Sequence, residues 1–158
     1  MLPAAVVIIA VVGYVVSSFQ TEVGLMEPGK GPRVAVAAAA EALGAATGPV
    51  ADGYSAFSRT LLAATVAQRN AAVGNPADAR VQALLTEALD CLYAVREAWQ
   101  ADIDGAWDPQ TQGSASYWNT VHPALELAGE SLLTAEDVRR MGAERAADRL
   151  EQALGLVD

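Results

Sequence analysis

The chain has only one cysteine, one histidine and one lysine, Lys30. What the sequence lacks excludes several classes of protein. One thiol, Cys91, cannot form an internal disulfide or a C-x-x-C motif. Gly-rich phosphate loops and G-x-S-x-G elbows are also absent from the sequence. Ten basic residues against 19 acidic ones give a net charge of −9, whereas nucleic acids and anionic lipid surfaces attract basic patches. We therefore expect no enzymatic activity, no cofactor and no nucleic-acid partner.

Charged side chains are also missing from residues 1–21, which are nearly all apolar. About 20 helical residues, at ~1.5 Å each, span the hydrocarbon layer of a bilayer. Residues 1–21 are therefore predicted to be a transmembrane helix that anchors a single-pass membrane protein. Lys30 and Arg33 follow it and favour a cytoplasmic location for the rest of the chain. One alternative is a cleaved signal peptide, which would leave a secreted soluble helical protein. Another is a buried strand or helix of a soluble core, since many residues of the segment are β-branched.

Small residues recur within this segment at Ala10, Gly13 and Ser17. Such a stripe lets a second membrane helix approach closely, so these residues are a candidate interaction surface. The simpler interpretation is that small residues are common in membrane helices.

The remainder of the chain is rich in good helix formers, and alanine alone makes up roughly a fifth of it. Residues 22–32 contain Pro28, Gly29, Gly31 and Pro32, which is typical of a linker. We expect residues 33–158 to form one small acidic domain. The predicted fold class is all-α, with an antiparallel bundle of about four to five helices and no strand.

Five helices are predicted within this domain. The first covers residues 33–47, and the second runs from residue 52 or 55 to residue 73. The third begins at Pro76 and ends near Ile103 or Gly105. The fourth follows a three/four spacing from Trp118 to Leu132 that is interrupted by Pro123, where it either kinks or begins. The fifth begins after Thr134, with Asp137 three residues later in a variant of the capping box.

Apolar residues alternate at spacings of four and three along the third helix. Such a seam must pack against another helix, either within the chain or in a coiled-coil oligomer. The short seam favours the intramolecular bundle. Its members are Val81, Leu85, Ala88, Leu92, Val95 and Trp99.

Three groups of side chains are candidate sites. His122, Glu126 and Glu130 would share one face of a continuous helix and are ligand types for zinc or iron. No second motif completes a metal site there, and a helix entry at His122-Pro123 is the simpler interpretation. These three residues nevertheless define the alternative function, a metal-binding or catalytic bundle.

Asp102, Asp104 and Asp108 surround Gly105 and resemble calcium ligands in type. Their spacing does not match an EF-hand loop, and an acidic helix end with a turn at Gly105 is favoured. The third group is aromatic, with Trp107 and Trp118 as candidate partner-binding residues near Trp99 and Tyr117. Aromatic residues of this kind more often close the end of a bundle core.

Together, these patterns predict a membrane-anchored interaction, scaffold or accessory subunit that performs no chemistry itself. Its partner is expected to be another protein or a second copy, bound through helices.

Overall fold

The computed structural model describes residues 31–47, 53–71, 76–129 and 132–157. This part contains five α-helices, one 3₁₀ turn and no strand, which confirms the predicted all-α class. The predicted anchor 1–21, its stripe Ala10, Gly13 and Ser17, and most of the linker lie outside the described residues. None of the described helices combines the length and the apolar character needed to cross a membrane.

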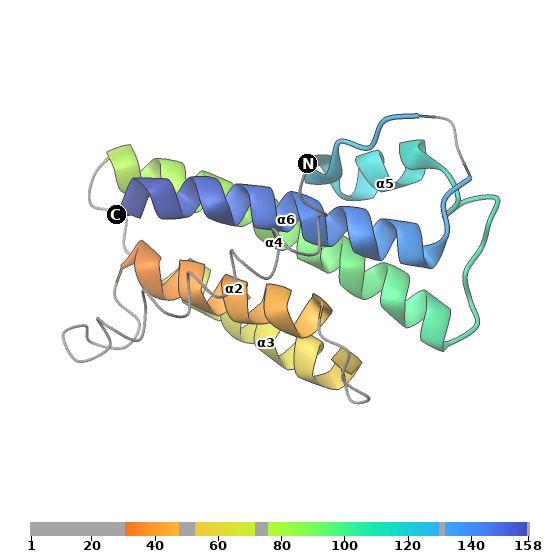
Figure 1. Cartoon of the computed structure of the whole chain (residues 1–158), viewed down its shortest axis with the longest axis horizontal. Helices are drawn as coiled ribbons and strands as arrows, with labels where there is room; N and C mark the ends of the chain where they lie inside the picture. The colour runs from red at the N-terminus through yellow and green to blue at the C-terminus, as the bar shows by residue number, and fades with distance from the viewer. Residues whose placement is uncertain (1–30, 48–52, 72–75, 130–131, 158) are drawn as a thin grey trace.

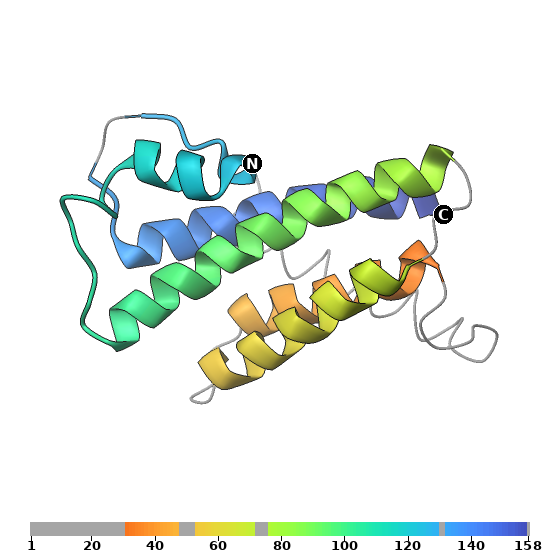
Figure 2. The ribbon, with the colours of Figure 1, turned by 180° about the vertical axis from the view of Figure 1, so that it is seen from behind.

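Four long helices form two antiparallel pairs (Figure 1). The first pair consists of α2 (Pro32–Thr47) and α3 (Gly53–Asn70), and the second of α4 (Pro76–Ile103) and α6 (Ala135–Val157). The short helix α5 (Ala115–Val121) and the 3₁₀ turn η1 (Pro123–Leu125) lie beside the second pair. Viewed from behind, α3 lies in front of α2 along the lower edge of the bundle (Figure 2).

The core is organised around α4, which packs against α2, α3, α6 and η1. Its buried stripe is therefore wider than the predicted seam and also includes Leu84, Leu89 and Cys91. Every seam residue is buried except Trp99, which is half-buried. The helices that cover this seam belong to the same chain, as the bundle interpretation requires.

Local sequence signals set the ends of the longest helices. Thr134 and Asp137 form a reciprocal capping box at the start of α6: Asp137 N–H donates to Thr134 Oγ1 at 3.1 Å, and Thr134 N–H donates to Asp137 Oδ2 at 2.9 Å. At the end of α4, Gly105 has a φ of 63°. Ala106 N–H donates to Ala101 O, and Gly105 N–H donates to Asp102 O. These two bonds form a Schellman motif, so the glycine ends α4.

The predicted helix from Trp118 to Leu132 is wrong. Helix α5 ends at Val121, and His122 has φ −130° and ψ 78°, because the residue before a proline disfavours helical backbone. Pro123 instead begins the 3₁₀ turn, and Glu126 closes it with a φ of 47°. The apolar spacing continued through this break, but Leu132 is 81% exposed.

Candidate functional site

His122, the only histidine, is held almost completely buried at the junction between α5 and η1. Its Nδ1 lies 2.9 Å from Asp90 Oδ1, and its Nε2 lies 3.1 Å from Glu97 Oε2. Asp90 and Glu97 are seven residues apart on α4, a spacing of two helical turns that places them on one face. The imidazole ring therefore bridges two carboxylates that come from positions two turns apart on α4.

Two further hydrogen bonds complete this arrangement. Tyr117 Oη donates to Glu97 Oε1 at 2.6 Å, and the backbone N–H of Ala124 donates to Asp90 Oδ2 at 3.1 Å. All four carboxylate oxygens thus have a partner in α5, η1 or their junction. We call Asp90, Glu97, Tyr117 and His122 the His122 network.

Hydrogen bonding fixes the donor role of Tyr117 within the network. The hydrogen bond to Glu97 raises the pKa of Tyr117 to about 12, because the carboxylate favours the protonated phenol. Tyr117 consequently remains a donor at neutral pH. The network joins α5 and η1 to α4 and leaves neither ring nitrogen without a partner.

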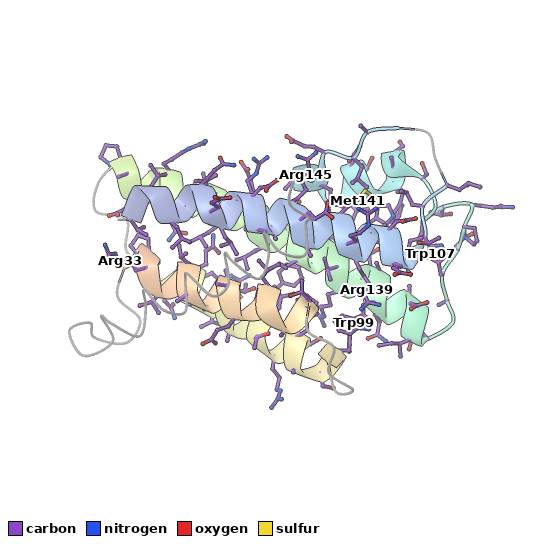
Figure 3. The ribbon with its side chains drawn as sticks, viewed as in Figure 1. Arg33, Trp99, Trp107, Arg139, Met141 and Arg145 are labelled. Carbon is purple, nitrogen blue, oxygen red and sulfur yellow. The ribbon has the colours of Figure 1, made fainter. Side chains whose placement is uncertain are left out.

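The aromatic residues separate into two clusters. Trp118 is fully buried, stacks on His122 at 6.1 Å between ring centroids, and stacks on half-buried Trp107 at 6.0 Å. Its indole N–H donates to Gln112 O at 2.6 Å. Trp99 belongs to a second cluster, where the Arg139 guanidinium lies 4.1 Å from its ring centroid (Figure 3). Trp118 is therefore a core residue that supports the His122 ring.

The first metal candidate loses its predicted geometry, because His122 and Glu126 do not lie on one continuous helix. The Glu126 carboxylate lies 3.4 Å from an Arg149 nitrogen, and Glu130 falls outside the described residues. Within the described ranges, no group of three or more histidine, cysteine, aspartate or glutamate side chains is arranged to hold a metal ion.

The three aspartates near Gly105 are exposed and make local contacts. Asp102 contributes its backbone carbonyl to the end of α4, and the Asp104 carboxylate accepts a hydrogen bond from Gln100. A hydrogen bond from Thr111 and another from the Gln110 backbone lower the pKa of Asp108. All three aspartates therefore make local structural contacts at the end of α4 and in the turn that follows it.

A hollow of about 490 Å³ opens beside the His122 network. Glu97 and His122 form part of its wall, together with Tyr54, Tyr93 and Arg96. It is lined mainly by α4 and brings solvent to the edge of the Glu97 carboxylate. The network is thus packed against Trp118 on one side and borders this hollow on another.

A second feature lies on the outer surface of α3. Leu62 is 63% exposed and Val66 is 47% exposed, although both are large apolar side chains. Arg59, Ala63 and Arg69 are also exposed and share this side of the helix. We call these five residues the α3 face. It is an apolar surface with one arginine at each end.

Sequence reasoning missed both partners of His122 and the α3 face. Asp90 and Glu97 are not among the predicted site residues, and their seven-residue spacing on one helix face does not by itself indicate a contact with His122. The α3 face could have been found from Leu62 and Val66, because these two apolar residues lie four positions apart in the second predicted helix. Comparison of the chain with protein-family models, with curated proteins and with solved structures finds no match.

Proposed function

We propose that this chain is a membrane-anchored interaction subunit that binds another protein through the α3 face. The exposed pair Leu62 and Val66 carries the proposal. Exposed apolar residues in one patch are typical of protein–protein contacts, whereas singly scattered ones are ordinary. In this chain they occur one turn apart on a helix whose opposite side packs against α2 and α4.

The remaining parts of the proposal agree with this surface. The uncharged segment 1–21 would hold the domain at a membrane, and residues 22–32 would serve as its tether. The His122 network ties its own polar groups to one another, which suits a structural role in keeping the domain rigid. A rigid helix face loses little conformational entropy when a partner binds.

The test uses the full chain with a C-terminal tag, purified in mild detergent. A co-purifying protein should be recovered with the wild type and lost from the variant Leu62→Ser/Val66→Ser, because the apolar contact is removed. Leu132→Ser is the matched control, since Leu132 is a more exposed leucine outside α3. A wild-type chain that is monomeric without a partner, or a partner kept equally by all three proteins, would overturn the proposal.

The anchor requires a separate measurement. Membranes are washed with alkaline carbonate, and the intact mass of the tagged chain is read from the pellet. Full-length protein in the pellet supports a retained transmembrane segment. A shortened product in the soluble fraction would contradict the anchor and favour the secreted alternative.

A further inference from the structure

The charge pattern of the α3 face indicates what kind of partner fits it. Arg59 and Arg69 are the only charged residues of α3, in a chain with nearly twice as many acidic as basic residues. Neither guanidinium has an ion-pair partner among the described residues. Ten residues of helix place the two charges roughly 15 Å apart, on either side of Leu62 and Val66.

We propose that the partner is an acidic amphipathic helix that lies along α3. Its apolar residues would pack on Leu62 and Val66, and carboxylates about ten residues apart would face Arg59 and Arg69. This inference rests on the proposed function and adds the chemistry of the partner. Helices recognise each other through such combinations of apolar anchors and flanking opposite charges.

Self-association through this face is disfavoured by the same charges. An antiparallel contact between two copies of α3, centred between Leu62 and Val66, would bring Arg59 of each copy toward Arg69 of the other. A parallel contact would bring identical arginines together. Both arrangements place like charges opposite each other, which selects against the pairing.

The other charged macromolecules fit less well than an acidic helix. Anionic lipids and nucleic acids attract clusters of several basic residues, whereas this face has two arginines on a chain of net charge −9. Two isolated arginines can pair with two carboxylates of a protein helix. A neutral partner would leave both of them unused.

The experiment places a photo-crosslinking benzoylphenylalanine at Ala63, an exposed member of the α3 face that leaves both arginines and both large apolar residues intact. The full chain is irradiated in its native membranes, and the cross-linked peptide is sequenced by mass spectrometry. The same substitution at Ala83, exposed on α4, is the control position.

The expected peptide comes from another protein and has carboxylates flanking an apolar i,i+4 pair. Its cross-linking yield should fall with added salt and about tenfold in Arg59→Gln/Arg69→Gln, since two exposed ion pairs are lost. Arg59→Lys/Arg69→Lys should retain most of the yield, because the charges remain.

Three kinds of cross-linked product would overturn this inference. They are a cross-linked peptide from a second copy of this chain, a lipid adduct, and a partner segment whose cross-linking yield changes neither with added salt nor in the two double arginine variants. The last result would leave the proposed function standing, because a partner would still occupy the α3 face. A yield at Ala63 no higher than at Ala83 would contradict both proposals.

Discussion

The side chain of His122 links α5 and η1 to α4 through hydrogen bonds. Its ring contacts two carboxylates that come from positions 32 and 25 residues away in sequence. Removing the ring would leave Asp90 and Glu97 with fewer donors while Trp118 loses a stacking partner. Both effects act on the same small region of the molecule.

We expect His122→Ala to lower the free energy of unfolding of the full chain by about 2 kcal/mol, because charged hydrogen bonds at a nearly buried side chain are lost. Urea denaturation followed by circular dichroism measures this change. Thr120→Ala is the control, since Thr120 is exposed and its hydroxyl donates only to the local Ser116 carbonyl. Equal decreases in the free energy of unfolding for the two variants would show that the contacts of His122 do not stabilise the fold.

Tyr117 should lose its proton at a higher pH than a free tyrosine does. Its pKa is raised to about 12, above the ordinary value of 10, by the hydrogen bond to Glu97. The protonated phenol is favoured in the folded chain, so its contribution to stability is present below pH 10 and is lost as the pH rises toward 12.

Absorbance at 295 nm follows this titration. A titration step near pH 12 should be present in the wild type and absent from Tyr117→Phe. An unchanged titration curve above pH 10 in the variant would contradict this assignment.

At the scale of elements, the first turn of α6 is held by the capping box of Thr134 and Asp137. Thr134→Ala should lower the free energy of unfolding by about 1 kcal/mol, a typical value for an N-cap residue. Ser114→Ala is a matched control, because Ser114 occupies the N-cap of α5 without a side-chain capping bond. Its effect should be close to zero in the same urea titration.

The capping box also gives a pH dependence. Hydrogen bonds from Thr134 lower the pKa of Asp137 below its ordinary 3.8. A carboxyl whose pKa is lowered by folding stabilises the fold above its unfolded-state value and loses that effect as the pH falls. The difference in stability between wild type and Thr134→Ala should therefore shrink in acid. A constant difference down to pH 2 would contradict this account.

Helices α4 and α6 approach closely at Gly142, where an added Cβ would lie 2.7 Å from Val95 Cγ2 and 3.0 Å from the Cys91 carbonyl oxygen. Gly142→Ala should destabilise the chain by about 1–2 kcal/mol, since overpacking outweighs the gain in helix propensity. Gly155→Ala lies on the same helix with open space around it and should stabilise by up to ~1 kcal/mol. Thermal unfolding of the two variants would separate the effects, and a stabilising Gly142→Ala would rule out the close contact.

Sequence alone predicted the elements whose ends have local chemical signals. Pro76 begins α4 and Thr134 precedes α6, as expected from proline and capping preferences. The segment after Trp118 was misjudged because its apolar spacing continues across Pro123, where the backbone leaves the helix. The His122 network could not be found from periodicity, since it forms only when α5 folds back onto α4.

At the scale of the whole molecule, the bundle is closed by a contact between its first and last helices. The Arg33 guanidinium donates to the Val157 carbonyl oxygen, with Nε at 3.0 Å. Arg33 lies at one end of the bundle, while Trp99 and Arg139 lie at the other (Figure 3).

Cys91 reports on opening of the whole bundle, because it is fully buried in α4. Burial, followed by the nearby Asp90 charge, raises the pKa of its thiol to about 12, so little reactive thiolate exists at pH 8. A thiol reagent should modify Cys91 only as fast as the chain unfolds in increasing urea.

The exposed position Gly155 provides the comparison for this measurement. Gly155→Cys should gain one thiol that reacts at once in native buffer, while Cys91 in the same chain remains protected. Equally fast reaction of both thiols would show that the core around α4 opens without unfolding.

The order of the helices along the chain has a consequence for biosynthesis. Helix α6 is the last helix of the described bundle, yet it covers much of the apolar stripe of α4. During translation, at ~5–20 residues per second, that apolar stripe leaves the ribosome before α6 has been synthesised. The nascent chain therefore exposes Leu85, Leu92 and the Cys91 thiol for several seconds. Chaperone binding to this stripe and oxidation of the Cys91 thiol are therefore most favoured during that interval.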